Sequence, residues 1–179
     1  MGNDGKGELV RQKSKIHDNY HSGATIAGYC DNSYYWLVND RNDNTVIEKE
    51  TDRIYCYKVD ENGVNPNPVI NEDFDIGNSA GNKFSPNGDK LYYFIGGNSL
   101  DIKLISDFNF KTGRLYNHRT IDFDFIWCNE FSPDSRLLYF FQEGNLIQLD
   151  VSFLNSLLIM NSADTILTLN SNAEYPYPE

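Results

Sequence analysis

The chain has 179 residues, with 26 acidic and 15 basic side chains and a formal net charge of −11. Its length suits one domain or a part of a larger one, and its 40% of apolar residues excludes disorder along the whole chain. The negative charge argues against broad affinity for nucleic acid, which requires clustered Lys and Arg. Since the sequence holds no run of 18 apolar residues, no membrane span is predicted.

The balance of residue types predicts the fold class. Tyr and Phe together number 23, whereas Ala numbers only 5. Few alanines and many aromatic residues disfavour a helical bundle and favour strands. Asn numbers 22 and is a common turn residue. We therefore expect an all-β fold of strands joined by turns.

Residues 1–15 are polar, and we expect a flexible N-terminal segment there. They contain no apolar core of a signal peptide, so no secretion signal is visible. The three cysteines, Cys30, Cys56 and Cys128, are odd in number and lack C-x-x-C spacing, which argues against zinc fingers and a dense disulfide framework. One disulfide with a spare thiol is an alternative, but we favour three small buried apolar residues.

The first repeated unit is expected at residues 16–76. A turn at 31–33 precedes an aromatic strand, Tyr34–Val38, and a second hairpin follows with strands at Arg53–Val59 and Val64–Ile70. The acidic stretch between these hairpins, Asn39–Asp52, lacks the spacing of a calcium loop. We interpret it as a solvated loop.

An internal repeat links the second and third units. The eleven residues from Phe84 to Phe94 recur 47 residues later, from Phe131 to Phe141, and six of them are identical. In each copy Pro ends a strand, Asn-Gly or Asp-Ser makes the turn, and a nearly continuous apolar strand follows. Such a strand is expected to be buried on both faces. The residues to which we assign a structural role in the repeat are Phe84, Ser85, Pro86, Leu91, Tyr92, Phe131, Ser132, Pro133, Leu138, Tyr139 and, in the first unit, Trp36.

A second hairpin follows each repeat motif. In the second unit it runs through Ile102–Phe110, turns at Lys111–Gly113 and returns through Arg114–Ile121. In the third unit the strands are expected at Asn145–Val151 and Thr165–Leu169, with an ambiguous stretch at 152–161 that can hold a short helical turn.

Four strands per unit, at a period of about 47 to 57 residues, are typical of the blade of a β-propeller. We expect an all-β, partial β-propeller of about three four-stranded antiparallel blades within residues 16–170. The blades are predicted at about 16–76, 77–122 and 123–170, and residues 171–179 are interpreted as a linker or the start of the next element. Since propellers close with about 4 to 8 blades, the expected partners are missing blades from the rest of a longer chain, or a second copy.

The motif Phe-Ser-Pro-Asn/Asp, followed by Leu-Tyr, resembles the blade motif of YVTN-type and WD-repeat-like propellers. In the first unit the order of His21, Tyr34–Val38, Tyr55-x-Tyr57, Gly63-Val64 and Pro68-Val69 is similar to the propeller region of exported surface proteins of the gliding-motility-associated, type IX secretion group. The resemblance covers roughly residues 15–170. It implies an exported or cell-surface location and carries no catalytic residue. The insert Asn39–Asp52 and the run Trp127–Glu130 depart from the pattern.

Histidines and paired carboxylates are the residues of this chain that could bind a metal ion. His17 and His21 are four residues apart, but the segment is not convincingly helical and lacks an H-E-x-x-H pattern. Asp122 and Asp124 alternate along an expected strand, which would place both carboxylates on one face. We interpret them as a polar strand face. His118, beside Arg119, is the one place where a His and an Arg are adjacent.

Other candidates also favour structural roles. Gly96-Gly97 opens no helix and is expected to be a turn rather than a phosphate cradle. Trp36 and Trp127 are expected to pack between blades, with sugar or partner stacking as the alternative. No G-x-S-x-G motif occurs.

These features favour a non-catalytic propeller module that binds or displays, with an unidentified protein or glycan ligand and no cofactor or metal. The alternatives are a lactonase-like propeller hydrolase and a cytosolic scaffold of WD-repeat type. We lean against an enzyme, because the sequence predicts no cluster of His, Arg and Glu.

Overall fold

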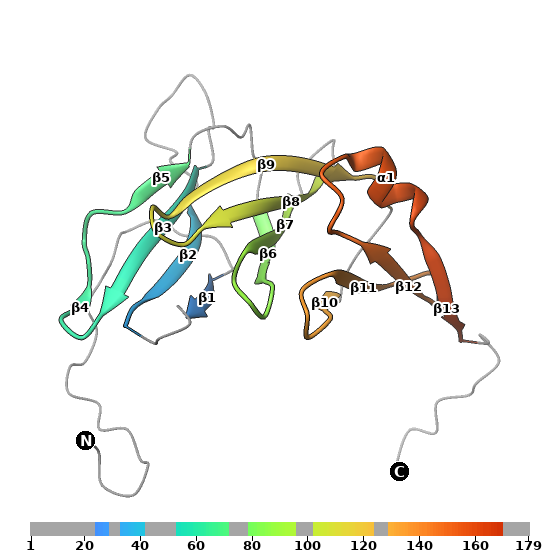
Figure 1. Ribbon diagram of the computed structural model, residues 1–179, viewed down its shortest axis with the longest axis horizontal. Coiled ribbons are helices and arrows are strands. Elements are labelled where there is room, and N and C mark those ends of the chain that lie inside the picture. Colours follow the sequence, from blue (N-terminus) through green and yellow to red (C-terminus); the bar gives the residue numbers. More distant parts are fainter. Residues whose placement is uncertain are drawn as a thin grey trace, which may run out of the picture.

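The computed structural model describes residues 24–28, 33–41, 53–71, 79–95, 102–123 and 129–169. Within them, thirteen strands form three antiparallel sheets, and one helix lies between the last two strands in the chain. The sheets stand side by side in chain order, from β1 to β13 (Figure 1). Each is a run of hairpins, as the alternation of apolar strands and turn residues predicts. Among the described residues, no helix has the length and apolar character needed to cross a bilayer.

The first sheet differs from the expected four strands. Its central strand β3 pairs with β2 on one side and with both β4 and β5 on the other. The predicted strand Val64–Ile70 is therefore wrong in its middle, because Pro66 and Pro68 lack the N–H that a ladder needs. The backbone turns there, and the Asn67 N–H donates to Asn65 Oδ1 at 2.9 Å. The strands are β1 (Ala24–Gly28), β2 (Tyr35–Arg41), β3 (Arg53–Asp60), β4 (Gly63–Val64) and β5 (Val69–Asn71).

The strand β2 also runs further than expected. Asn39 and Asp40, assigned to an acidic loop, pair with Tyr55 and Ile54 of β3. The remainder of that predicted loop, from residue 42 to residue 52, lies outside the described residues.

The second sheet is a simple four-stranded meander. Its predicted turn at Lys111–Gly113 is confirmed, with Gly113 in the left-handed region at φ +70°. The last strand ends at Ile121, so Asp122 follows the sheet and the predicted face of alternating carboxylates is wrong at this residue. Asp124 lies outside the described residues. The strands are β6 (Ser79–Phe84), β7 (Lys90–Ile95), β8 (Ile102–Asn109) and β9 (Arg114–Ile121).

The third sheet has the same order and carries the helix. The expected helical turn is confirmed as α1, which begins after Asn155, whose side chain accepts hydrogen bonds from the Leu157 and Leu158 N–H groups. Ile159 is the helix residue that is buried. The elements are β10 (Asn129–Phe131), β11 (Leu137–Gln142), β12 (Asn145–Asp150), α1 (Ser156–Asn161) and β13 (Asp164–Thr168).

Two apolar clusters fill the spaces between the sheets. The first joins Trp36 and Val38 of β2 to Leu91 and Tyr93 of β7. The second joins Tyr92 of β7 to the third sheet. The second sheet is thus covered on both faces, and Leu91, Tyr92 and Tyr93 all have 0% exposure. The expectation of a strand buried on both sides is confirmed for β7.

The equivalent strand β11 does not follow that expectation. Leu138 and Phe140 are buried, but Leu137 and Tyr139 are half-buried and Phe141 is 41% exposed. Burial alternates because only one face of β11 meets a neighbouring sheet among the described residues. The three stacked antiparallel sheets make this chain an all-β, partial β-propeller.

Candidate functional site at the repeat turns

The two copies of the repeat motif form turns with the same hydrogen bonds. The Ser85 N–H donates to the Lys90 carbonyl at 2.9 Å, and the Lys90 N–H donates to Ser85 Oγ at 3.0 Å. Ser132 and Leu137 exchange the matching pair of bonds, both at 2.8 Å. The serine of Phe-Ser-Pro therefore closes its turn with both backbone and side chain, and both serines are buried.

The residue two positions after each serine explains the Asn and Asp of the motif. Ser85 Oγ donates to Asn87 Oδ1 at 3.1 Å, and Ser132 Oγ donates to the Asp134 carboxylate. This bond from Ser132, with the backbone N–H of Arg136, lowers the pKa of Asp134 below its ordinary value. The prolines between them, Pro86 and Pro133, are exposed.

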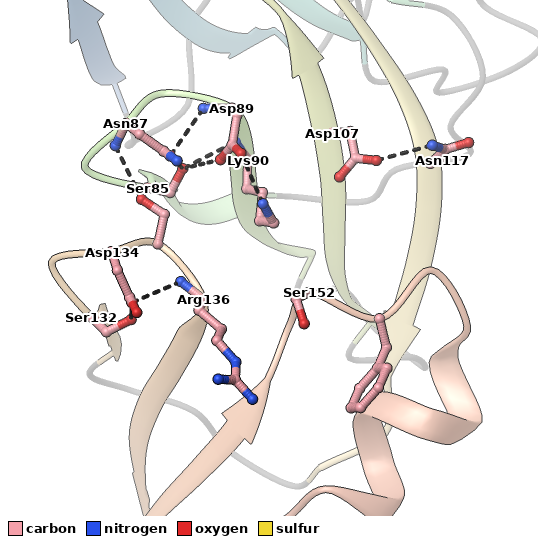
Figure 2. A network of polar contacts seen from close by, with 12 residues as sticks. Ser85, Asn87, Asp89, Lys90, Asp107, Asn117, Ser132, Asp134, Arg136 and Ser152 are labelled. Atoms are coloured by element: carbon pink, nitrogen blue, oxygen red, sulfur yellow. Dashed lines mark hydrogen bonds and ion pairs between the residues drawn. The ribbon is translucent and has the colours of Figure 1, made fainter.

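The two turns lie side by side and are joined directly (Figure 2). Gly88 and Ser135 occupy equivalent positions in the left-handed region, at φ +72° and φ +63°. A glycine adopts this conformation freely, whereas a serine is strained there. The Ser135 hydroxyl is also a cross-sheet acceptor, since the Asn87 N–H donates to it at 3.0 Å. We call the two turns, residues 85–89 and 132–136, the polar rim.

An ion pair joins Arg136, the last residue of the polar rim, to Asp150 at the end of β12. Arg136 places Nε and Nη2 at 2.9 and 2.7 Å from Asp150 Oδ2. Burial opposes ionisation of Asp150, but the bonds from Arg136 and Ser152 outweigh it and lower the Asp150 pKa. The same carboxylate raises the pKa of Arg136.

A second ion pair lies deeper. Arg119 is 2% exposed and donates from Nη2 to Asp107 Oδ1 at 2.5 Å, while its Nη1 donates at 3.3 Å to the carbonyl of Phe153, in the loop between β12 and α1. Asn117 donates to the other oxygen of Asp107 at 2.9 Å. Because Nη1 of Arg119 reaches the Phe153 carbonyl, this cluster ties the second sheet to the segment that follows β12 in the third unit.

The predicted packing of Trp36 is confirmed. Its ring is T-shaped against Phe108, with centroids 5.9 Å apart, and its Nε1 donates to the Phe110 carbonyl at 2.7 Å. The Tyr34 hydroxyl donates to the same carbonyl at 3.1 Å. Gly113 lies against the indole, where an added Cβ would be 2.5 Å from Trp36 Cη2. Trp36 is thus a contact between sheets and does not face solvent.

The structure places the other repeat residues within the two clusters. Phe84 and Leu91 belong to the cluster between the first and second sheets, and Tyr92, Phe131 and Leu138 to the one between the second and third. Tyr139 lines an open pocket on the far side of the third sheet. Leu91 and Leu138 are both fully buried, as the repeat register requires.

The adjacent pair His118-Arg119 does not act together, because neighbouring strand residues point to opposite faces. His118 instead lies against Ser106, with 2.6 Å between Nδ1 and Oγ, and Ser106 Oγ is 3.0 Å from the Tyr93 hydroxyl. A Ser–His contact resembles an activated nucleophile. Ser106, however, is 0% exposed, so its hydroxyl is not accessible to a substrate in this conformation.

Cys56 is a free, fully buried thiol, as expected for a small apolar residue. Burial raises its pKa to about 12, against the opposing effects of an Asn71 hydrogen bond and the Arg114 charge. Several candidates lie outside the described residues, namely His17, His21, Cys30, Cys128, Trp127, Asp124 and Gly96-Gly97.

Sequence reasoning missed Asn71, which is 5% exposed and spans two sheets. Its Nδ2 donates to the Gly113 carbonyl at 3.3 Å, and its Oδ1 accepts from the Leu115 N–H at 2.9 Å. No pattern distinguishes this Asn from the 21 others in the chain. Ser135 could have been found, because aligning the repeats places it opposite Gly88.

Among the described residues, no group of three or more His, Cys, Asp and Glu side chains is arranged to hold a metal ion. The rim can instead offer exposed amide, carboxylate and guanidinium groups in fixed positions. Such groups form hydrogen bonds with hydroxyl-rich or peptide ligands.

No family model matches the chain, and no curated protein matches it. Among solved structures, it is similar to a candidate 6-phosphogluconolactonase of Bacteroides fragilis, with 12% identity over 70% of this chain and a TM-score of 0.45. It is also similar to a candidate 6-phosphogluconolactonase of Bacteroides uniformis, with 17% identity over 74% of this chain and a TM-score of 0.42. The chain spans only 34% and 37% of the lengths of these proteins.

Proposed function

We propose that this chain is a non-catalytic binding or display module of β-propeller type. The observation that carries the proposal is the polar rim, in which two repeat turns with the same internal bonds are joined by the bond from the Asn87 N–H to Ser135 Oγ. Turns held by their own hydrogen bonds lose little entropy when a ligand binds. A rigid scaffold that presents loops is a common basis for recognition.

The chemistry of the rim favours a polar ligand. Its exposed side chains offer acceptors at Asn87, Asp89 and Asp134 and a cation at Arg136. Carboxylate and amide oxygens accept hydrogen bonds from sugar hydroxyls and from peptide N–H groups. We propose a glycan or a protein segment as the ligand.

We further propose an exported or cell-surface location. Support comes from the resemblance of the blade order to exported surface propellers, and a net charge of −11 is compatible with a solvated surface protein. A direct test is cell fractionation of a tagged, full-length gene product with protease shaving of intact cells. Protection of the tag in intact cells would exclude surface display.

The lactonase-like alternative requires His, Arg and carboxylate groups that converge on one accessible point. The described histidine, His118, instead faces the fully buried Ser106. This arrangement favours the binding module over the hydrolase.

The proposal is tested with the fluorescently labelled chain on an array of surface glycans and peptides. The double variant Asp89→Asn/Asp134→Asn keeps the hydrogen-bond acceptors of the turns and removes two charges. It is expected to weaken binding of any array ligand about tenfold or more, with unchanged thermal unfolding. Glu143→Gln is the matched control, because the β11–β12 turn lies at the other end of the strand β11 from the rim and Glu143 is exposed.

Equal binding by the double variant and the control would show that the polar rim is not the surface that binds the ligand. Turnover of glucono-δ-lactone or its 6-phosphate by the full chain, above the spontaneous rate, would instead establish the hydrolase.

A further inference from the structure

The aromatic strand of each sheet allows equivalent positions to be compared. Aligning these strands by sequence places Trp36, Tyr92 and Tyr139 at one position, in β2, β7 and β11. The ring of Trp36 is buried against Phe108 of the second sheet, and Tyr92 is buried in the cluster with the third sheet. Tyr139 is only half-buried and lines an open pocket. A neighbouring sheet therefore covers this position twice, and its third occurrence lies open among the described residues.

The position two residues further along shows the same series. Val38 is buried between the first and second sheets, and Phe94 packs against the cluster between the second and third. Phe141, the equivalent residue of the third sheet, is 41% exposed. Phe94 and Phe141 are the same residue type at the same position of the motif, so their difference in burial comes from the neighbouring sheet.

The open residues belong to one face of the third sheet. The buried residues of β11 face the second sheet, so the alternate residues Tyr139 and Phe141 point away from it. Cross-strand pairing adds Glu130 beside Tyr139, and Leu146 beside Phe141. Leu146 in turn pairs with Leu167 of β13, which is exposed. We call this side the trailing face of the third sheet, made of these five residues.

The pocket on the trailing face is a shallow hollow. It has a volume of about 290 Å³, and its walls are mostly apolar side chains. This volume is at or below the lower end of small-molecule sites, which span about 300–1,000 Å³. The size and lining suit a protruding side chain of a covering sheet better than a separate ligand. The hollow is lined by Asn129, Glu130, Tyr139, Phe140, Phe141 and Leu146.

The side chains that cover the equivalent residues are alike at both junctions inside the chain. Each covering sheet contributes the Phe of its Phe-Ser-Pro motif and a Leu-x-aromatic pair from the strand that follows. One side of the repeat is therefore suited to cover the sheet that precedes it. The covering residues are Phe84, Leu91 and Tyr93 at the first junction and Phe131, Leu138 and Phe140 at the second.

The charge on the first strand of each sheet adds a second requirement. Lys83 and Glu130 occupy equivalent positions, and their side chains pair across the junction between the second and third sheets. By the same geometry, the equivalent residue of a sheet placed on the trailing face would lie beside Glu130. A Lys or Arg there would be attracted to the carboxylate, whereas an Asp or Glu would be repelled.

A second copy of this chain does not meet these requirements. The covering sides of its second and third sheets are buried inside the chain, which leaves only the outer side of its first sheet. That side carries Tyr55 and Tyr57, because Ile54 and Cys56 of β3 point to the second sheet. Tyr55 and Tyr57 are 4% and 3% exposed, so the side is already covered around them. A further sheet of the repeat is therefore the better occupant.

We propose that the trailing face of the third sheet docks a further four-stranded sheet of the same repeat type, supplied by the same polypeptide. The docked sheet carries a Phe-Ser-Pro motif, a Leu-x-aromatic strand and a basic residue beside Glu130. Its contact repeats the one between the second and third sheets. The inference rests on the fold and the internal repeat, and it is independent of the proposed function.

The test compares three single cysteine variants of the full-length gene product, Phe141→Cys, Phe94→Cys and Leu157→Cys. Phe94 is the equivalent position that the third sheet covers, and Leu157 is an α1 residue that is 66% exposed. The rate of modification by a maleimide is measured at each site by mass spectrometry. Phe141→Cys should react about as slowly as Phe94→Cys and about tenfold or more slower than Leu157→Cys, because a thiol inside a sheet-to-sheet contact reacts only when the contact opens.

Photocrosslinking identifies the occupant of the trailing face. Benzoylphenylalanine in place of Phe141 should, on irradiation, crosslink within one polypeptide to a segment that carries the Phe-Ser-Pro and Leu-x-aromatic pattern. The same replacement of Phe94 is the matched control. It should crosslink to the third sheet, since Phe94 packs against the cluster with that sheet. The crosslinked peptides are identified by mass spectrometry.

Circular dichroism is measured for every variant, so that loss of fold is separated from loss of the contact. A folded Phe141→Cys variant that reacts as fast as Leu157→Cys would overturn the proposal. Protection that disappears on dilution, with crosslinks between two molecules, would overturn it in favour of a second copy. A crosslink to a different protein, or to a segment without the repeat pattern, would overturn it as well.

Discussion

Lys83 and Glu130 stand at the same position of the repeat, 47 residues apart, and their side chains form an ion pair 2.7 Å long between the second and third sheets. Equivalent positions of one motif thus touch across the junction, because their strands β6 and β10 are the first strands of neighbouring sheets. The two side chains are 40% and 63% exposed, so solvent screens the attraction.

The pair Lys83–Glu130 is expected to contribute little to stability. A double-mutant cycle with Lys83→Ala and Glu130→Ala should give a coupling free energy of about 0.2–1 kcal/mol that declines at high salt. Urea unfolding at 0.05 and 1 M NaCl measures it. A coupling that does not depend on salt would contradict this picture of an exposed pair.

Leu91→Ala and Leu138→Ala should both destabilise the fold strongly. Both side chains have 0% exposure, and deleting a buried Leu side chain costs about 2–5 kcal/mol. The free energy of unfolding in urea, followed by Trp fluorescence, measures the loss. Leu154→Ala is the control, because Leu154 is 70% exposed and should change stability little. A small effect at either buried leucine would contradict the shared register of the two repeats.

Gly113→Ala should be among the most damaging single changes. Gly113 combines φ +70° with a Cβ position 2.5 Å from the Trp36 ring. Gly144 has a similar φ of +77°, but its added Cβ meets only an ordinary contact at 3.4 Å. Gly144→Ala should therefore show the backbone strain alone, and the difference between the two melting temperatures reports the clash. Similar losses in both variants would show that the turn can move away from the indole.

Ser135 offers a test that separates strain from hydrogen bonding. Ser135→Ala keeps the strained φ of +63° and removes the acceptor of the Asn87 N–H, so it should cost about 0.5–1.5 kcal/mol. Ser135→Gly removes the same acceptor but relieves the backbone. It should be more stable than the Ala variant in urea unfolding. The reverse order would mean that the turn is not held in the left-handed region in solution.

The ion pair of Asp150 with Arg136 should make stability fall in acid. The folded-state pKa of Asp150 lies below its ordinary value of 3.8. A depressed carboxyl pKa contributes stability that is present above the unfolded pKa and is lost as the pH falls through the folded pKa. The contribution of Asp150 should therefore decline below about pH 4. Thermal unfolding of Asp150→Asn between pH 7 and pH 2.5 should show a shallower decline than the unchanged chain, and parallel curves would contradict the assignment.

The sequence was sufficient to predict most of the strands but not their surroundings. The spacing of the Phe-Ser-Pro motifs predicts β7 and β11 correctly, because turn chemistry and apolar runs are local signals. The burial of β11 was predicted wrongly, since Phe141 has the same sequence context as Phe94 and differs only in the sheet beyond it. Burial of the second face depends on the neighbouring sheet, so the sequence of the strand itself does not predict it.

The contacts of the candidate site were even harder to predict from the sequence. The buried bridge from Asn71 to Gly113 and Leu115 joins residues more than 40 positions apart, and only the stacking of the sheets brings them together. Ser135 is the exception. Its match to Gly88 in the aligned repeats predicts a left-handed residue, although its bond to Asn87 depends on the distance between two turns.

The interrupted outer strand of the first sheet also has a consequence for self-assembly. A continuous outer strand would present a row of N–H and C=O groups that can template cross-β growth from chain to chain. Pro66 and Pro68 remove two of those N–H groups, and the intervening Asn67 N–H is already bonded to Asn65. This edge of the molecule is therefore a poor seed for amyloid, and a Pro66→Val/Pro68→Val variant should form thioflavin-positive fibrils sooner than the unchanged chain.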